Sequence, residues 1–130
     1  MNTKDQYGFR FRDWQVYKDA RKFRKDINQL ATKFPPHEKY ALTDQTRRSL
    51  NSIILNIAES TNKNSDKDMK LYINRSHCSV DEVVACLDCA YDEGYINEQE
   101  LEVALTQAEK LAKQLTAFTV YLSTSKKVNR

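Results

Sequence analysis

Turn-forming residues are scarce in this chain. Glycine and proline each occur only twice in 130 residues, well below their average usage. This shortage favours a few long helices over many short strands. The two glycines, Gly8 and Gly94, are far apart, so the sequence has no glycine-rich loop of the kind that binds phosphate groups.

Long apolar runs are also missing. No run approaches the roughly 18 residues that a membrane span requires, and the segment MNTKDQYGFRFRDW lacks the apolar centre of a secretory signal. Charged residues make up 30% of the chain and hydrophobic residues 40%, a balance typical of one globular domain with its own core. We therefore expect a cytoplasmic protein that makes no membrane contact.

Residue patterns typical of catalysis are few. The histidines, His37 and His77, have no partner at metal-ligand spacing, and no serine has a base at a recognisable offset. Cys86 and Cys89 give only a weak metal or redox signal, because they fall within an expected helix and no second Cys/His pair accompanies them. We expect both to be small packing residues, and we expect no enzyme, cofactor, metal site or small-molecule substrate.

Apolar residues recur at helical spacing in the first half of the chain. One helix is expected over residues 13–33. A second is expected over about 44–61, after Pro35 and Pro36, which cannot continue a helix, and Thr43 is its expected N-cap. The two apolar stripes are Val16, Ala20, Phe23, Ile27, Leu30 and Phe34, followed by Leu50, Ile53, Ile54 and Ile57.

Two further helices are expected in the second half. The third covers residues 66–93, with Ser65 as its cap and Gly94 as its terminator. The fourth covers residues 98–122, with Asn97 as its cap. Four helices with short connections predict an all-α, up-down-up-down four-helix bundle.

The predicted domain organisation has three parts. Residues 1–12 show no helical period and are expected to form a flexible N-terminal arm. Residues 13–122 are expected to form the four-helix bundle. Residues 123–130 are polar and basic, and we expect a flexible tail there.

The segment from the Pro-Pro turn through the second helix carries a specific combination of residue types. They are Phe34, Pro35, Glu38, Tyr40, Leu42, Gln45, Arg47, Arg48, Ser52, Asn56, Ile57, Ala58 and Glu59. This combination resembles the signature of the four helix bundle protein family, also called the 23S rRNA intervening-sequence protein family. The resemblance continues over about residues 10–122, with one departure: Ser60 stands where the family usually has glycine.

The resemblance implies a ring-like homopentamer. A related branch of the family is the accessory protein of diversity-generating retroelements, a basic pentamer that partners a reverse transcriptase and nucleic acid. Many family genes lie inside insertions of ribosomal RNA genes. Most members have no established biochemical activity, so the resemblance implies an assembly and a class of partner.

Several expected helices carry mixed residues on the faces opposite their core stripes. A monomeric bundle would expose mainly charge there. Our candidate subunit-interface residues are Trp14, Tyr17, Arg48, Leu55, Leu71, Cys78 and Cys89. The alternative is that they are scattered surface residues, since isolated exposed apolar side chains are common.

Positive charge concentrates near the N-terminus. Residues 1–38 contain nine Lys/Arg against five Asp/Glu, whereas residues 66–93 contain three against seven. The candidate nucleic-acid-binding residues are Lys18, Arg21, Lys22, Arg24, Lys25, Arg47 and Arg48. The alternative for the first helix is a solvated face beside a tryptophan buried in a subunit interface.

The motif residues also have structural interpretations. Arg47 and Arg48 could pair with Glu38, Glu59 or an acidic residue of the third helix. Glu38 is expected to close the Pro-Pro turn or to meet a helix end, with Tyr40 packed beside it. Other polar motif residues are expected to be satisfied at helix or subunit contacts: Gln45, Asn56 and Glu59.

Together these observations predict a non-enzymatic, homopentameric four-helix-bundle scaffold. Its expected partners are its own copies, RNA or DNA, and a nucleic-acid-processing protein such as a reverse transcriptase. The alternative is a protein-binding adaptor or structural ring that has no nucleic-acid role.

Overall fold

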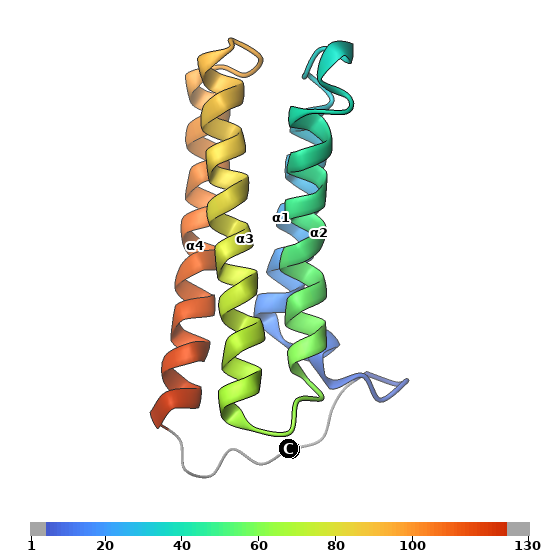
Figure 1. Cartoon of the computed structure of the whole chain (residues 1–130), viewed down its shortest axis with the longest axis vertical. Helices are drawn as coiled ribbons and strands as arrows, with labels where there is room; N and C mark the ends of the chain where they lie inside the picture. Colours follow the sequence, from blue (N-terminus) through green and yellow to red (C-terminus); the bar gives the residue numbers. More distant parts are fainter. Residues whose placement is uncertain (1–4, 125–130) are drawn as a thin grey trace.

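The computed structural model describes residues 5–124, and this part of the chain contains helices and no strands. The predicted all-α fold with four long helices is confirmed. Figure 1 shows them running alternately up and down along one axis. They are α1 (Gln15–Ala31), α2 (Leu42–Ser60), α3 (Asp66–Asp92) and α4 (Glu98–Thr124), with 3-10 turns η1 (Arg10–Asp13) and η2 (Pro36–Glu38).

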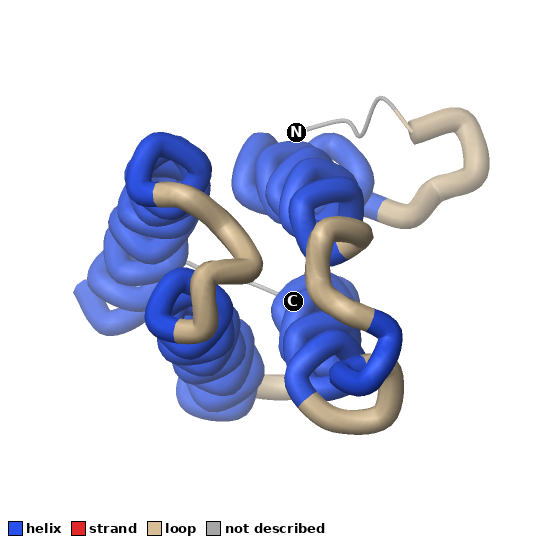
Figure 2. The backbone as a smooth tube through the Cα atoms, turned by 90° about the horizontal axis from the view of Figure 1, so that it is seen from above, coloured by secondary structure: helices blue, strands red, loops and turns tan. Residues whose placement is uncertain are grey.

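Figure 2 shows the bundle from above, with the helices at the four corners. Each helix packs against the helices that precede and follow it in the chain, and α1 also packs against α4. None of the helices in the described range is long and apolar enough to cross a membrane.

The predicted apolar stripes form the core. Their members are almost all buried and belong to one continuous cluster that joins all four helices. Leu30 and Ile54 differ, because both are only half-buried at the edge of this cluster. Both therefore remain partly open to the surface, between α1 and a neighbouring helix.

Small hydroxyl side chains fill much of the contact between α2 and α3. The Oγ of Ser76 donates a hydrogen bond of 2.8 Å to the backbone oxygen of Ile53, and the Oγ of Ser79 donates one of 2.8 Å to the Oγ of Ser52. Helix separation depends on side-chain size at the contact, so these serines let α2 and α3 lie close together. The buried polar residues are Thr46, Ser49, Ser60, Ser76 and Ser79.

The start of α2 differs from the prediction. The helix begins at Leu42, so Thr43 lies inside its first turn, and the residue before it, Ala41, makes no side-chain cap. The backbone N–H of Leu42 donates instead to Oε1 of Glu38, at 3.1 Å. Because the η2 turn brings Glu38 back over the helix start, its carboxylate takes the role expected of Thr43, and that expectation was wrong.

The other predicted caps are confirmed. The N–H of Asp68 donates to the Oγ of Ser65 at 3.1 Å. Asn97 and Glu100 exchange two hydrogen bonds at the start of α4, each from a backbone N–H to the other residue's side chain, at 2.8 and 2.9 Å. Gly94 follows α3 with φ of +79°, a conformation that glycine adopts without steric cost.

Part of the predicted N-terminal arm folds back on the bundle. Its Phe11 ring packs edge-on against Tyr17 of α1, with centroids 4.9 Å apart. Arg12 pairs with Asp5 at 2.6 Å. The basic tail predicted at 123–130 lies outside the described residues, except for its first two, which belong to α4.

Candidate nucleic-acid interface

A row of basic side chains follows one side of α1. The helix turns Val16, Ala20 and Phe23 into the core, so the opposite side of α1 faces outward. The five basic residues predicted from the sequence all lie on this side of the molecule: Lys18, Arg21, Lys22, Arg24 and Lys25. The structure therefore gathers them on one surface.

These residues line a groove of about 880 Å³ beside α1, which we call the basic groove. Its remaining lining residues are uncharged: Tyr17, Asn28, Gln29, Thr32 and Ile54. Ile54 comes from α2, so the groove runs between α1 and α2. No carboxylate is among its lining residues, so all the charged side chains that line it are positive.

The five cations have different local partners. Lys22 pairs with Asp26 at 2.6 Å, and Nε of Arg24 donates to Oδ1 of Asn51 at 2.8 Å, across the groove. Lys18 and Lys25 form no ion pair within the described part of the chain. Neither ammonium group is therefore held in a salt bridge when an anion approaches, although Lys25 lies close enough to Asp26 to help lower the pKa of that carboxyl.

The guanidinium of Arg21 lies over the ring of Tyr17, 5.9 Å from its centroid. This is the distance range of a cation–π contact. The contact holds a planar cation at the edge of the groove, where its face can also meet another planar group.

A second hollow, of about 450 Å³, continues the basic surface toward the Pro-Pro turn. It shares Asn28 and Thr32 with the basic groove and adds Lys39 and Arg47. No carboxylate lines it either. The two hollows together form a surface along α1 and onto the start of α2 whose charged lining residues are all Lys or Arg, and we call it the basic face.

The structure separates the two arginines of the motif. Arg47 lies on the basic face, whereas Arg48 points away from it. Arg48 pairs with Asp44 at 3.4 Å and donates to Gln45 at 3.4 Å, both on its own helix. The partners proposed from the sequence were therefore wrong for Arg48, because its i−4 neighbour is closer than any residue of another element.

Glu38 joins the turn between α1 and α2 to the turn between α3 and α4, at one end of the bundle. Its Oε2 accepts a 2.7 Å hydrogen bond from the Tyr95 hydroxyl, and His37 lies 3.2 Å from the same hydroxyl. The hydrogen bonds from Tyr95 and from the Leu42 backbone lower the pKa of Glu38. Donating its hydrogen bond to Glu38 also raises the pKa of Tyr95, to about 12. Tyr40 does not pack beside Glu38, since it is 85% exposed.

The remaining polar motif residues of α2 all have partners within the chain. Gln45 donates to Glu82 of α3, and Asn56 donates to the Oγ of Ser52 at 3.0 Å. Glu59 pairs with Lys63 at 3.4 Å. Each is satisfied within the chain, as expected of structural residues.

The candidate interface residues fall into two groups. Trp14 is half-buried against Phe118 of α4, with ring centroids 5.1 Å apart, and Tyr17 packs on Phe11. Leu55 and Leu71, by contrast, are 63% and 46% exposed on α2 and α3. The exposed cysteines Cys78 and Cys89 also lie on α3, and Arg48 is exposed on α2.

Cys86 lies apart from the other two cysteines, because its side chain is buried. Burial raises the pKa of its thiol above the ordinary value. Cys86 is therefore a packing residue, as expected, but the same expectation was wrong for Cys89 within this chain, because its side chain is exposed. Within residues 5–124, no three His, Cys, Asp or Glu side chains gather closely enough to hold a metal ion.

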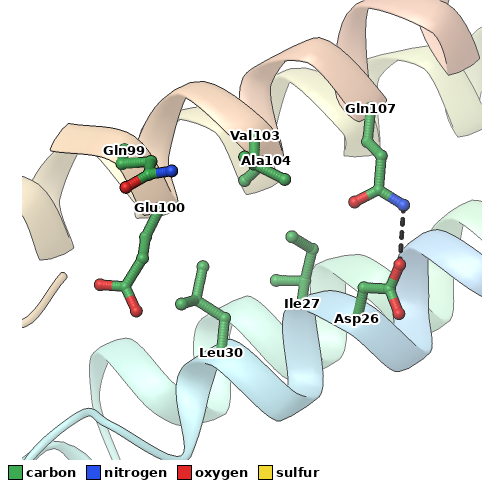
Figure 3. Close-up of a pocket in the computed structure, with 8 residues that line it drawn as sticks. All are labelled: Asp26, Ile27, Leu30, Gln99, Glu100, Val103, Ala104 and Gln107. Carbon is green, nitrogen blue, oxygen red and sulfur yellow. Dashed lines mark hydrogen bonds between the residues drawn. The ribbon is translucent and has the colours of Figure 1, made fainter. Parts of the chain in front are cut away.

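The sequence did not predict a third hollow, of about 340 Å³, between α1 and α4 (Figure 3). Ile27, Leu30 and Val103 give it an apolar lining, and at its edge Gln107 donates to Asp26 at 2.9 Å. The only sequence signal was the small residue Ala104 of α4, which leaves room opposite α1.

Known proteins resemble this chain in sequence pattern and in fold. Residues 12–117 match the model of the 23S rRNA-intervening sequence protein family. A solved structure described as a protein of unknown function from the S23 ribosomal protein family of Bacteroides thetaiotaomicron has the same fold, with a TM-score of 0.72. It is 20% identical, and the match covers 80% of this chain and 97% of that one. No curated protein matches.

The matched residues begin in η1 and end in the last turns of α4, so the family model spans all four helices, including the basic face. The resemblance inferred from the motif is therefore confirmed. The chain belongs to the 23S rRNA-intervening sequence protein family.

Proposed function

We propose that this protein is a non-enzymatic scaffold that binds nucleic acid along its basic face. One observation carries the proposal: the basic groove is lined by five Lys/Arg side chains and by no carboxylate. Phosphate groups are the ligands that such a surface attracts, and their binding releases condensed counterions. The family name associates its members with intervening sequences of 23S rRNA, so RNA is the first ligand to test.

The uneven charge of the chain supports a single binding face. Residues 66–93, which include α3, carry seven Asp/Glu against three Lys/Arg. This segment would repel phosphates, while α1 would attract them. Nucleic acid would therefore approach the bundle from the α1–α2 side.

The proposal is tested by neutralising three cations of the groove at once. The variant combines Lys18→Gln, Arg21→Gln and Lys25→Gln, and RNA binding is followed by fluorescence anisotropy. A charge-matched control combines Lys67→Gln, Lys110→Gln and Lys113→Gln, whose positions lie on α3 and α4. We expect the groove variant to lose most of its affinity and the control to keep it. If both variants lost RNA affinity equally, the loss would reflect only the lower net charge of the protein, and this result would contradict a defined binding site.

We also propose that the scaffold is a homopentamer. The support is the exposed Leu55 and Leu71, which leave apolar surface on α2 and α3. Five chains of net charge +3 would carry +15, which would strengthen the attraction for nucleic acid. Light scattering should give about five times 15.2 kDa. A monomer mass would refute assembly, and a dimer mass would refute the pentamer.

A protein-binding adaptor without a nucleic-acid role is the competing function. It predicts that no RNA or DNA binds even at low salt, while the assembly stays intact. The binding and light-scattering measurements together separate the two functions.

A further inference from the structure

We infer that the basic groove takes a single strand of nucleic acid, with its phosphates on the α1 cations and its bases turned into the hollow between α1 and α2. This inference rests on the proposed function and adds the form of the ligand. Three features of the groove support it: the placement of its charges, its size, and the chemistry of its floor, by which we mean Tyr17, Asn28 and Ile54.

The charges lie along the outer edge of the groove. Lys18, Lys22 and Lys25 follow one line of α1, at spacings of four and three residues. Tyr17 and Ile54 lie between the two helices instead, where Tyr17 packs against Phe11 and Ile54 against the core. A duplex presents phosphates outward and keeps its bases paired inside, so it would meet only the edge. A single strand can use both the edge and the floor.

The groove is large enough for bases. Its volume of about 880 Å³ falls in the range of about 300–1,000 Å³ typical of sites that hold small organic molecules. The adjoining hollow of about 450 Å³ continues it through Asn28 and Thr32. From Lys18 to Thr32 the helix rises roughly 21 Å, at about 1.5 Å per residue, which gives room for a short run of nucleotides.

The floor suits flat, partly polar groups. Ile54 is half-buried and offers an apolar surface, and the planar guanidinium of Arg21, 5.9 Å from the centroid of the Tyr17 ring, is a group on which a base can stack. Asn28 is half-buried and lines both hollows. Its amide group places a polar side chain where the two hollows meet.

The test compares oligonucleotides of one length, about twelve nucleotides, as single-stranded RNA, single-stranded DNA and the two corresponding duplexes. Affinities are measured at the same salt concentration. We expect both single strands to bind at least about tenfold more tightly than either duplex. Duplexes that bind as tightly as single strands would overturn the inference and leave the proposed function standing. If none of the four oligonucleotides bound, both this inference and the proposed function would be overturned.

A floor variant provides the second test. Ile54→Glu places a carboxylate in the hollow and leaves every cation of the edge in place. We expect it to lose single-strand binding by at least about tenfold and to keep the weak duplex binding of the edge. The control is Val103→Glu, which adds the same charge at a position 61% exposed on α4. Unchanged single-strand binding by a folded Ile54→Glu variant, verified by circular dichroism, would overturn the placement of the bases.

Discussion

The hydroxyl of Tyr95 donates a 2.7 Å hydrogen bond to Oε2 of Glu38, and this bond ties the turn between α1 and α2 to the turn between α3 and α4. The other carboxylate oxygen of Glu38 caps the start of α2. One side chain therefore fixes both the entry of α2 and the distance between two turns that are far apart in the sequence.

The hydrogen bond between Tyr95 and Glu38 predicts how the stability of the fold depends on pH. The raised pKa of Tyr95 adds stability that is fully present below the ordinary value of 10 and is lost as the pH rises through about 12. The lowered pKa of Glu38 adds stability that is present above its ordinary value of 4.5 and is lost as the pH falls through the lower folded-state value.

Tyr95→Phe should therefore lower the melting temperature at neutral pH and flatten the loss of stability between pH 10 and about 12. Thermal unfolding across this pH range provides the measurement. Tyr40→Phe is the matched control, because Tyr40 is 85% exposed and should change neither property. Equal behaviour of the two variants would contradict the role assigned to the Tyr95–Glu38 bond.

Ser76 tests the close approach of α2 and α3. Ser76→Ala removes its hydrogen bond to Ile53 and should cost about 1 kcal/mol of the free energy of unfolding. Ser76→Leu adds volume to a fully buried contact and should cost about 1–3 kcal/mol or more. Urea denaturation measures both, with Thr116→Leu on the exposed face of α4 as control. A neutral Ser76→Leu would show that the contact has spare room.

The cysteines should differ in reactivity. Cys78 and Cys89 are exposed, whereas Cys86 is buried and burial raises the pKa of its thiol. A colourimetric thiol reagent should therefore modify Cys86 only after denaturation. Cys86→Ala should leave the number of fast-reacting thiols in the folded protein unchanged. A fall of that number by one in Cys86→Ala would place Cys86 at the surface.

The two motif arginines should separate in function. Arg47→Gln removes a cation from the basic face and should lower the salt slope of RNA binding by about one. Arg48→Gln breaks only an exposed pair with Asp44 and should cost less than about 0.5 kcal/mol of stability while binding is retained. The reverse pattern, with binding lost only in Arg48→Gln, would contradict the placement of the basic face.

Periodicity alone predicted most of the fold. The apolar stripes of α1 and α2 follow directly from helical spacing, and Ser65, Gly94 and Asn97 act on backbone groups only a few residues away in the sequence. The N-cap of α2 was assigned wrongly to Thr43, whereas the expectation that Glu38 closes the Pro-Pro turn or meets a helix end is confirmed at the start of α2. The Glu38 carboxylate competes for the Leu42 N–H only because the η2 turn brings it there, and local propensity contains no information about that turn's path.

The site was predicted less completely. A row of basic residues on one helix is visible as a pattern, but the groove depends on how closely α1 and α2 pack, and the sequence does not specify this. Arg47 and Arg48 are adjacent in the chain yet about 100° apart around a helix. Which of them lies on the basic face depends on where the neighbouring helices pack, and the sequence alone does not give this. The hollow between α1 and α4 has the same origin, since it depends on how side chains from two helices fit together.

The salt dependence of RNA binding tests the central claim most directly. The association constant of the parent protein and of the Lys18, Arg21 and Lys25 triple variant is measured at several salt concentrations. If phosphates contact the basic groove, the logarithm of the constant should fall steeply with the logarithm of salt for the parent, and the slope should be shallower by about three for the variant. Identical slopes for the two proteins, or no RNA binding by the parent at low salt, would contradict the account.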